Sequence, residues 1–119
     1  MSTLNVSNLS DGTDTVATGY VINGSAKAWV NFDGTGTVAI RDSYNISSLI
    51  DFDTGGYTIN FTNAFGNANY ASPSMTRNNF ILGKFGTETA SSLSMENRTN
   101  GGSETDSVYV TVAAIGDLA

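Results

Sequence analysis

The sequence predicts an all-β protein: an antiparallel β-sandwich, jelly-roll-like or barrel-like, with an extended N-terminal arm. Apolar and polar residues alternate through several short runs, as they do in strands that bury one face. Segments rich in Gly and Asp separate these runs at spacings of about 8–12 residues, which is typical of sandwiches and barrels. A length of 119 residues suits one domain, and we expect that domain to span residues 26–119.

Residues 1–25 form the predicted arm, a polar segment rich in Thr and Gly with little alternation. Short strands are predicted at residues 4–6 and 18–23. The scattered apolar residues of the arm are Leu4, Val6, Leu9 and Val16. We interpret the arm as an assembly or attachment segment, because it would fray unless it packs against neighbouring subunits.

Alternation predicts the strands of the domain at residues 28–32, 37–41, 44–52, 57–61 and 108–114. The positions expected to share a face within each run are Ala28, Val30 and Phe32; Val38 and Ile40; Tyr44, Ile46, Ser48, Ile50 and Phe52; Tyr57, Ile59 and Phe61; and Val108, Val110 and Val112. Tyr44 and Tyr57 alternate with Ile, so core packing is favoured for both over stacking on sugars. Trp29 has polar neighbours on its face, which leaves it open for such stacking.

Residues 63–106 show the weakest alternation and contain most of the Asn. The segment "SSLSMENR" is too short and too rich in Ser to predict a helix, and no other segment requires one. "RNNF" and "ENRTNGGSETD" are predicted to be exposed loops, and Pro73 is predicted to lie in a loop or at a strand edge.

Two glycine-bearing segments, "DGTGT" and "DFDTGG", lie between predicted strands. A phosphate-binding loop would lead into a helix, so both segments are interpreted as hairpin turns. Asp33, Asp42, Asp51 and Asp53 offer oxygen ligands, but "DFDTGG" lacks the third acidic ligand and the closing Glu of a calcium loop. Turn capping by Asp51 and Asp53 is favoured, a calcium ion near this pair stays open as the alternative, and no cofactor is expected.

The composition argues against an enzyme and against nucleic-acid binding. The chain has no Cys and no His, which excludes zinc fingers, haem ligation, thiol nucleophiles and imidazole bases. A net charge of −6 with five scattered Lys and Arg residues argues against binding to phosphate backbones. Charged residues make up only 13% of the chain, against about 25% in typical proteins, which favours an extracellular or virion surface.

No apolar run approaches the roughly 20 residues of a membrane span, so no membrane insertion is expected. The N-terminus has neither a basic start nor an apolar segment, so we expect no secretory signal and synthesis in the cytoplasm.

The block "AKAWVNFDGTGTVAIRDSYNISSLIDFDTGGYTINFTNAF", with the following "NANY", resembles a module of marine bacteriophage virion proteins of the tail-fibre or receptor-binding type. The resemblance covers residues 26–70, and it departs from the family pattern at "IDFDTGG", where that family usually has "TDNGTGD". A hairpin with Gly near its tip survives this change. The resemblance implies a structural role in the virion, without catalytic residues.

We therefore expect a bacteriophage virion protein that assembles as a homotrimer, contacts other proteins of the tail or capsid, and displays loops to a host surface glycan. The loop residues expected to contact a receptor are Arg77, Asn78, Asn79, Phe80, Asn97 and Arg98. The alternatives are a capsid decoration (cement) protein or head fibre and, third, a carbohydrate-binding module of a cellular surface protein.

Overall fold

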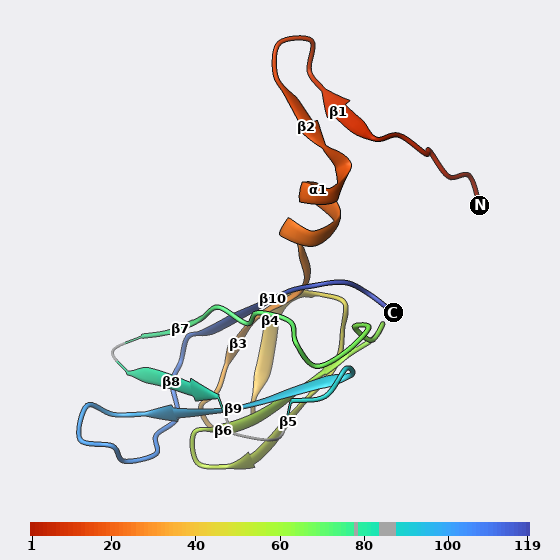
Figure 1. Ribbon diagram of the computed structural model, residues 1–119. Helices are drawn as coiled ribbons and strands as arrows, with labels where there is room; N and C mark the ends of the chain where they lie inside the picture. Colours follow the sequence, from red (N-terminus) through yellow and green to blue (C-terminus); the bar gives the residue numbers. More distant parts are fainter. Residues whose placement is uncertain (78, 84–87) are drawn as a thin grey trace.

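Two four-stranded antiparallel sheets face each other in the computed structural model, which confirms the predicted β-sandwich (Figure 1). The structure describes residues 1–77, 79–83 and 88–119. In spatial order, the first sheet contains β4 (Ala39–Tyr44), β3 (Ala26–Asp33), β10 (Val110–Ile115) and β7 (Ser74–Thr76). The second sheet contains β5 (Ile46–Asp53), β6 (Gly56–Phe61), β9 (Ser92–Arg98) and β8 (Phe80–Gly83).

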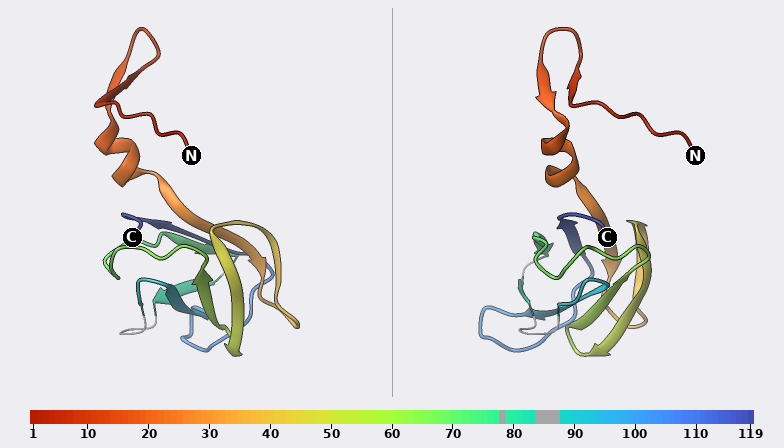
Figure 2. Two further views of the ribbon diagram at one scale, coloured as in Figure 1. Left: turned by 90° about the vertical axis from the view of Figure 1, so that its right-hand side faces the viewer. Right: turned by 45° about the vertical axis from the view of Figure 1, so that its right-hand side comes forward.

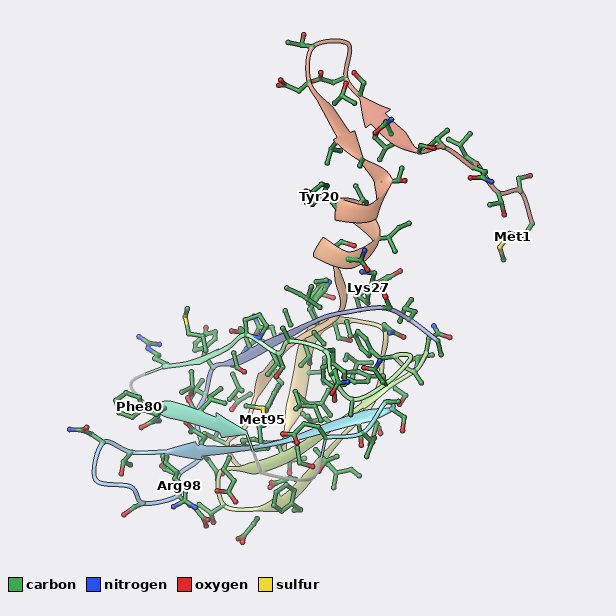
Figure 3. The ribbon with its side chains drawn as sticks, in the orientation of Figure 1. Met1, Tyr20, Lys27, Phe80, Met95 and Arg98 are labelled. Carbon is green, nitrogen blue, oxygen red and sulfur yellow. The ribbon has the colours of Figure 1, made fainter. Side chains whose placement is uncertain are left out.

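The arm projects from one end of β3 and lies outside the sandwich (Figure 2). It contains a small hairpin, β1 (Asn8–Ser10) and β2 (Thr15–Ala17), followed by the helix α1 (Thr18–Gly24). The whole chain measures 50 × 28 × 25 Å, so the arm makes it distinctly elongated. Figure 3 shows Met1 and Tyr20 on this projection, well away from Met95 in the sandwich.

Both strands predicted for the arm are wrong. The first strand lies at β1 rather than at residues 4–6, and the second predicted strand is the helix α1. A strand needs a neighbour to bond its backbone, and α1 has none because it spans the gap between hairpin and sandwich. The helix satisfies its own groups instead: at its end the Ser25 N–H donates to the Val21 carbonyl oxygen at 3.2 Å.

The two glycine-bearing segments are hairpin connections, as predicted. β3 pairs with β4 around "DGTGT", and β5 pairs with β6 around "DFDTGG". Their antiparallel registers place Asp33 opposite Ala39 and Asp53 opposite Gly56. These segments therefore build the scaffold of the sandwich.

The predicted strand at residues 44–52 is wrong in its start and in its buried face. Asn45 has a positive φ of 58°, and the chain passes there from β4 in the first sheet to β5 in the second. Register shifts within β5 then change which side chains point inward. As a result Tyr44, Ile50 and Phe52 are exposed, and Leu49 packs against the core with Ile46.

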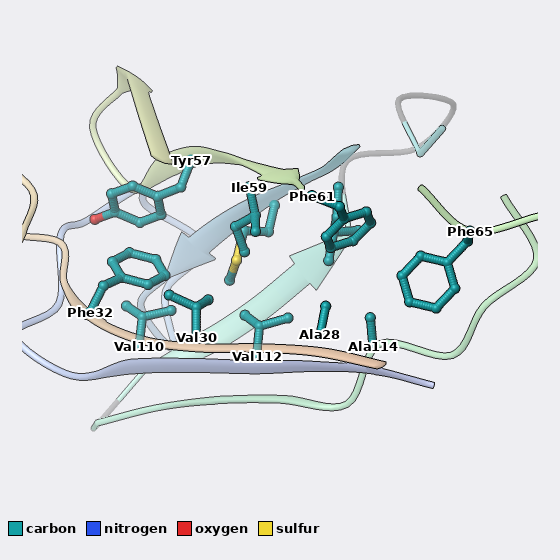
Figure 4. Close-up of a cluster of buried hydrophobic side chains, with 12 residues drawn as sticks. Ala28, Val30, Phe32, Tyr57, Ile59, Phe61, Phe65, Val110, Val112 and Ala114 are labelled. Atoms are coloured by element: carbon teal, nitrogen blue, oxygen red, sulfur yellow. The ribbon is translucent and has the colours of Figure 1, made fainter. Parts of the chain in front are cut away.

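The core lies between the sheets and is filled by alternate residues of β3, β6 and β10, as predicted (Figure 4). Its buried members are Ala28, Val30, Phe32, Tyr57, Ile59, Phe61, Phe65, Leu93, Met95, Val110, Val112 and Ala114. Each large side chain among them contributes about 1.5–3 kcal/mol through burial. Ile40 and Val108 are exposed instead, because Arg41 forms a bulge in β4 and Val108 precedes the start of β10.

Strand β9 (Ser92–Arg98) corrects the prediction that "ENRTNGGSETD" is an exposed loop, because the first three residues of that segment belong to the strand. It lies in the interior of the second sheet, between β6 and β8. Leu93, Met95 and Asn97 are all buried, so an amide interrupts the apolar alternation that would have revealed the strand. The Ser94 hydroxyl is also satisfied inside the sheet, 2.8 Å from the Thr58 hydroxyl.

An aromatic cluster closes one end of the sandwich. Phe65 and Tyr70 come from the segment between β6 and β7, and their ring centroids lie 5.0 and 5.5 Å from that of Phe61. Burial raises the pKa of Tyr70 to about 12. Pro73 directly precedes β7, the edge strand of the first sheet, which confirms its predicted place.

A polar clamp closes the opposite end. The buried Tyr57 hydroxyl lies 2.9 Å from the Gly34 carbonyl oxygen and 3.1 Å from Asp106 Oδ1. The same Asp106 oxygen accepts the Gly55 N–H at 2.7 Å, and the Gly34 N–H donates to the Ser107 carbonyl oxygen at 2.8 Å. Both glycine-bearing turns are therefore tied to the segment that leads into β10.

We expect Gly55→Ala to destabilise the fold much more than Gly36→Ala. Both glycines have positive φ, 70° and 58°, but a Cβ on Gly55 would lie 2.5 Å from the Asn97 carbonyl oxygen, whereas one on Gly36 would meet nothing within 4 Å. Gly36→Ala should cost about 1 kcal/mol in free energy of unfolding and Gly55→Ala about 3 kcal/mol or more. Urea unfolding followed by circular dichroism measures both, and equal losses would contradict the close packing at Gly55.

We also expect stability to fall at alkaline pH partly through Tyr70. Its pKa is about 12 in the folded chain and about 10 when unfolded, so the folded state holds the proton more tightly. The resulting stabilisation is complete below pH 10 and is lost as the pH rises toward 12. Between pH 9 and about 11.5 the free energy of unfolding should therefore decline less steeply in Tyr70→Phe than in the wild type. Tyr20→Phe, on the exposed helix α1, is the control, and parallel curves for all three proteins would refute the assignment.

Candidate functional site

The structure brings together two of the predicted receptor-contact residues, Phe80 and Arg98. They are cross-strand partners on β8 and β9, and Figure 3 shows both near the same end of the second sheet. The Phe80 side chain is exposed by 57%. This pair is therefore a surface position that only strand pairing assembles.

Arg98 is held by neighbouring carboxylates. Its Nη2 donates to Glu96 Oε2 at 2.8 Å and to Glu104 Oε1 at 3.2 Å, and its Nη1 donates to the Gly102 carbonyl oxygen at 3.0 Å. The hydrogen bond to Glu96 raises the pKa of Arg98 further above its usual range. Arg98 therefore organises the loop after β9 and offers little free positive charge to a ligand.

The prediction that Asn97 lies in an exposed loop is wrong. Its side chain is 0% exposed, because Asn97 belongs to β9 and points into the sandwich. Its Nδ2 donates to the Thr105 carbonyl oxygen at 2.7 Å. Its backbone N–H donates to the Gly55 carbonyl oxygen, also at 2.7 Å. A side chain in this position supports the polar clamp and cannot contact a receptor.

The other three residues predicted to contact a receptor have different outcomes. Asn78 lies outside the described residues. Asn79 is half-buried, and its Nδ2 donates to the Arg77 carbonyl oxygen at 3.3 Å. Arg77 itself is exposed and lies over Tyr109, at the end of the first sheet.

The exposed side of the first sheet, here called the outer face, carries a second group of surface residues. Strand pairing places Trp29 between Tyr44 and Ala113, and it places Asn31 between Asp42 and Thr111. Met75 on β7 is the next neighbour of Thr111. One row across this face thus contains the aromatic residues Tyr44 and Trp29, and the next row contains polar residues.

A shallow groove of about 480 Å³ runs over β10 on the outer face. Trp29 forms one wall, Pro73 and Met75 form the other, and the small residues Thr111 and Ala113 form the floor. Trp29 is exposed by 38% and Met75 by 72%, so Trp29 lies outside the core, and its stacking on sugars stays a hypothesis. We call this feature the Trp29 groove.

A second hollow of about 340 Å³ continues from the Trp29 groove, with Met75 and Thr111 in common. Tyr109 lies in its lining, with the guanidinium carbons of Arg41 and Arg77 at 4.1 and 5.7 Å from the ring centroid. Arg41 also forms an ion pair with Asp33 at 3.6 Å. Arg77 has no carboxylate within ion-pair distance in the described part of the chain.

Asp33 and Asp53 each accept a backbone N–H of their turns, whereas Asp51, also predicted to cap, accepts none in the described part of the chain. Asp33 Oδ1 accepts the Thr35 hydroxyl at 2.6 Å and the Thr35 N–H at 2.9 Å, and these bonds lower the pKa of Asp33. Asp53 Oδ1 accepts the N–H of the adjacent Thr54 at 2.8 Å. Over residues 1–77, 79–83 and 88–119, no three carboxylates are grouped to hold a metal ion, around Asp51 and Asp53 or elsewhere.

The arm residues Leu4, Val6, Leu9 and Val16 are all exposed. Leu9 and Val16 are cross-strand partners in the β1–β2 hairpin. Helix α1 has no buried residue and adds exposed Tyr20, Val21 and Ile22 to the apolar surface of the arm. Sequence reasoning missed the last three because it assigned them to a strand.

Comparison with known proteins adds no relative: no family model, no curated protein and no solved structure matches this chain. Within the described ranges, no helix has the length and hydropathy to span a bilayer.

Sequence reasoning missed Tyr109, Arg41 and Met75 as members of one surface. A signal existed for Tyr109, because it alternates with Val110, which was expected to point inward. Nothing local indicated that β7 would lie beside β10 and bring Met75 to the groove.

Proposed function

We propose that the chain is a non-enzymatic structural subunit of a bacteriophage virion, of the tail-fibre or receptor-binding type. In this proposal the arm joins the subunit to its neighbours and the sandwich is displayed outward. The observation that carries the proposal is the projecting arm, whose apolar side chains are exposed in the single chain.

The arm lacks the means to order itself. A lone two-stranded hairpin is marginally stable at best in water. The helix α1 has seven residues, whereas isolated helices shorter than about 12–15 residues are marginal. Burying the exposed apolar residues of the arm against other subunits would supply about 25 cal/mol for each Å² covered. We therefore expect the arm to become ordered when it packs against other subunits.

The virion setting is supported by the sequence resemblance over residues 26–70 to phage tail-fibre modules. The absence of Cys and His from the sequence supports a role without catalysis. A homotrimer suits an arm that must bury apolar residues by symmetric packing, and other virion proteins could cover the same residues.

A capsid decoration protein or a head fibre is the second candidate. The same projecting arm could pin one sandwich to a capsid shell without trimerisation. The third candidate, a carbohydrate-binding module, is favoured by the Trp29 groove alone.

Light scattering coupled to size-exclusion chromatography tests self-assembly on the full chain. We expect a trimer for the wild type and a loss of affinity of at least about tenfold for Leu9→Asp/Val16→Asp, because buried unpaired charges oppose packing. Thr13→Ala, in the turn of the same hairpin, should leave the mass unchanged. A wild type that stays monomeric at all concentrations would exclude the homotrimer.

Micrographs of virions labelled with an antibody to the chain test the location. Label at the tail supports the fibre, and label at symmetric positions on the shell supports the decoration protein. Unlabelled virions would refute the virion proposal as a whole. Purified protein should also block adsorption of phage to host cells if the subunit binds the receptor.

A further inference from the structure

We propose that the Trp29 groove and the adjoining Tyr109 hollow bind an acidic polysaccharide, a glycan whose sugar rings carry carboxylates. The inference deepens the proposed function, on which it rests for the display of the sandwich to a host surface. It places the ligand site on the outer face of the first sheet, where Arg77 lies but Phe80 and Arg98 do not.

The shape of the groove suits a chain of sugar rings. The two hollows, of about 480 and 340 Å³, are each within the range of about 300–1,000 Å³ that ligand sites occupy. They share Met75 and Thr111, so together they form one continuous track from Trp29 to Tyr109. A track with raised walls and a floor of small residues accepts a narrow chain more readily than a second protein, whose contact needs about 800 Å² per partner.

The lining offers the two kinds of contact that sugars make. One face of a pyranose ring presents C–H groups, which stack on an aromatic ring, and its rim presents hydroxyls, which need hydrogen-bond partners. Trp29 supplies an exposed aromatic ring at one end of the track, and at the other end the guanidinium groups of Arg41 and Arg77 lie over the Tyr109 ring. Between them, Asn31 accepts a hydrogen bond from Arg41 at 3.3 Å through Oδ1, and its Nδ2 donates to no group in the described part of the chain. That amide can donate to a sugar hydroxyl.

Arg77, unpaired in the described part of the chain, favours an acidic glycan over a neutral one at the Tyr109 end of the site, whereas Asp33, paired with Arg41, and Asp42, beside Asn31, carry negative charge on the same sheet. Lys27, Arg41 and Arg77 all belong to or adjoin the first sheet, and they are three of the five Lys and Arg residues in a chain of net charge −6. Lys27 lies two positions before Trp29 on β3, at a register shift against β10, and its Nζ donates to the Ser25 carbonyl oxygen at 2.9 Å. Arg77, over Tyr109, has no carboxylate partner among the described residues. A carboxylate on the bound sugar would supply that partner.

Isothermal titration calorimetry with oligosaccharides of galacturonate, glucuronate and mannuronate tests the proposal, with their methyl esters as neutral counterparts. We expect at least one acid form to bind and to weaken as salt rises, and its ester to bind more weakly. Trp29→Ala should weaken binding by about tenfold or more, and Met75→Ala should weaken it by a smaller factor. Arg77→Gln should weaken binding of the acid by about fivefold and leave the ester unchanged. Circular dichroism verifies that each variant is folded.

Phe80→Ala is the matched control, because Phe80 is an exposed aromatic residue on the second sheet. Binding unchanged in Trp29→Ala, or no binding to any of the acidic oligosaccharides at millimolar concentration, would overturn the proposal. If Trp29→Ala instead lowers the mass in light scattering, the outer face is an interface between copies and the proposal is also overturned. Leu9→Asp/Val16→Asp should lose the trimer and keep the affinity per chain, which separates failure of this site from failure of the assembly proposal.

Discussion

The hydroxyl of Tyr57 and the carboxylate of Asp106 form the interaction on which the sandwich depends. The hydroxyl is buried, and a buried hydroxyl left without a partner costs about 1–3 kcal/mol, so its single proton must go to one of the two acceptors within reach, the Gly34 carbonyl oxygen and Asp106 Oδ1. Burial and the nearby Asp106 charge raise the pKa of Tyr57, which keeps the phenol protonated. Asp106 also accepts the Gly55 N–H, and the Gly34 N–H donates to the Ser107 carbonyl oxygen, so both hairpin turns are tied to the segment entering β10. The Phe32 ring then packs edge-on against Tyr57, with centroids 5.0 Å apart.

The alternation of side chains along β3 and β10 determines what the first sheet exposes. Val30 on β3 and Val112 on β10 point into the core, so the residues next to each of them in the sequence face outward. Trp29, Thr111 and Ala113 are therefore placed on the surface by the same alternation that fills the core. The short edge strand β7 completes the groove with Met75. In this fold the scaffold and the candidate ligand surface are two sides of the same strands.

The arm and the sandwich obtain their order from different sources. The sandwich encloses its own core. Aromatic rings close one of its ends, and the polar clamp closes the other. The arm has a hairpin and a helix whose apolar side chains remain exposed. One part of the chain is thus suited to display, and the other is suited to attachment.

The sequence by itself determined the features that depend on near neighbours. Alternation at β3, β6 and β10 predicted their buried faces, and Gly and Asp predicted both hairpin turns, because pleat and turn geometry act over a few residues. Only the tertiary structure decided the rest. Helix α1 replaced a predicted strand since no partner strand lies beside it, and Asn97 is buried because it lies on the same face of β9 as the core residues Leu93 and Met95. The Phe80–Arg98 pair and the Trp29 groove join strands far apart in the chain, and pairing over such distances depends on how the whole core packs.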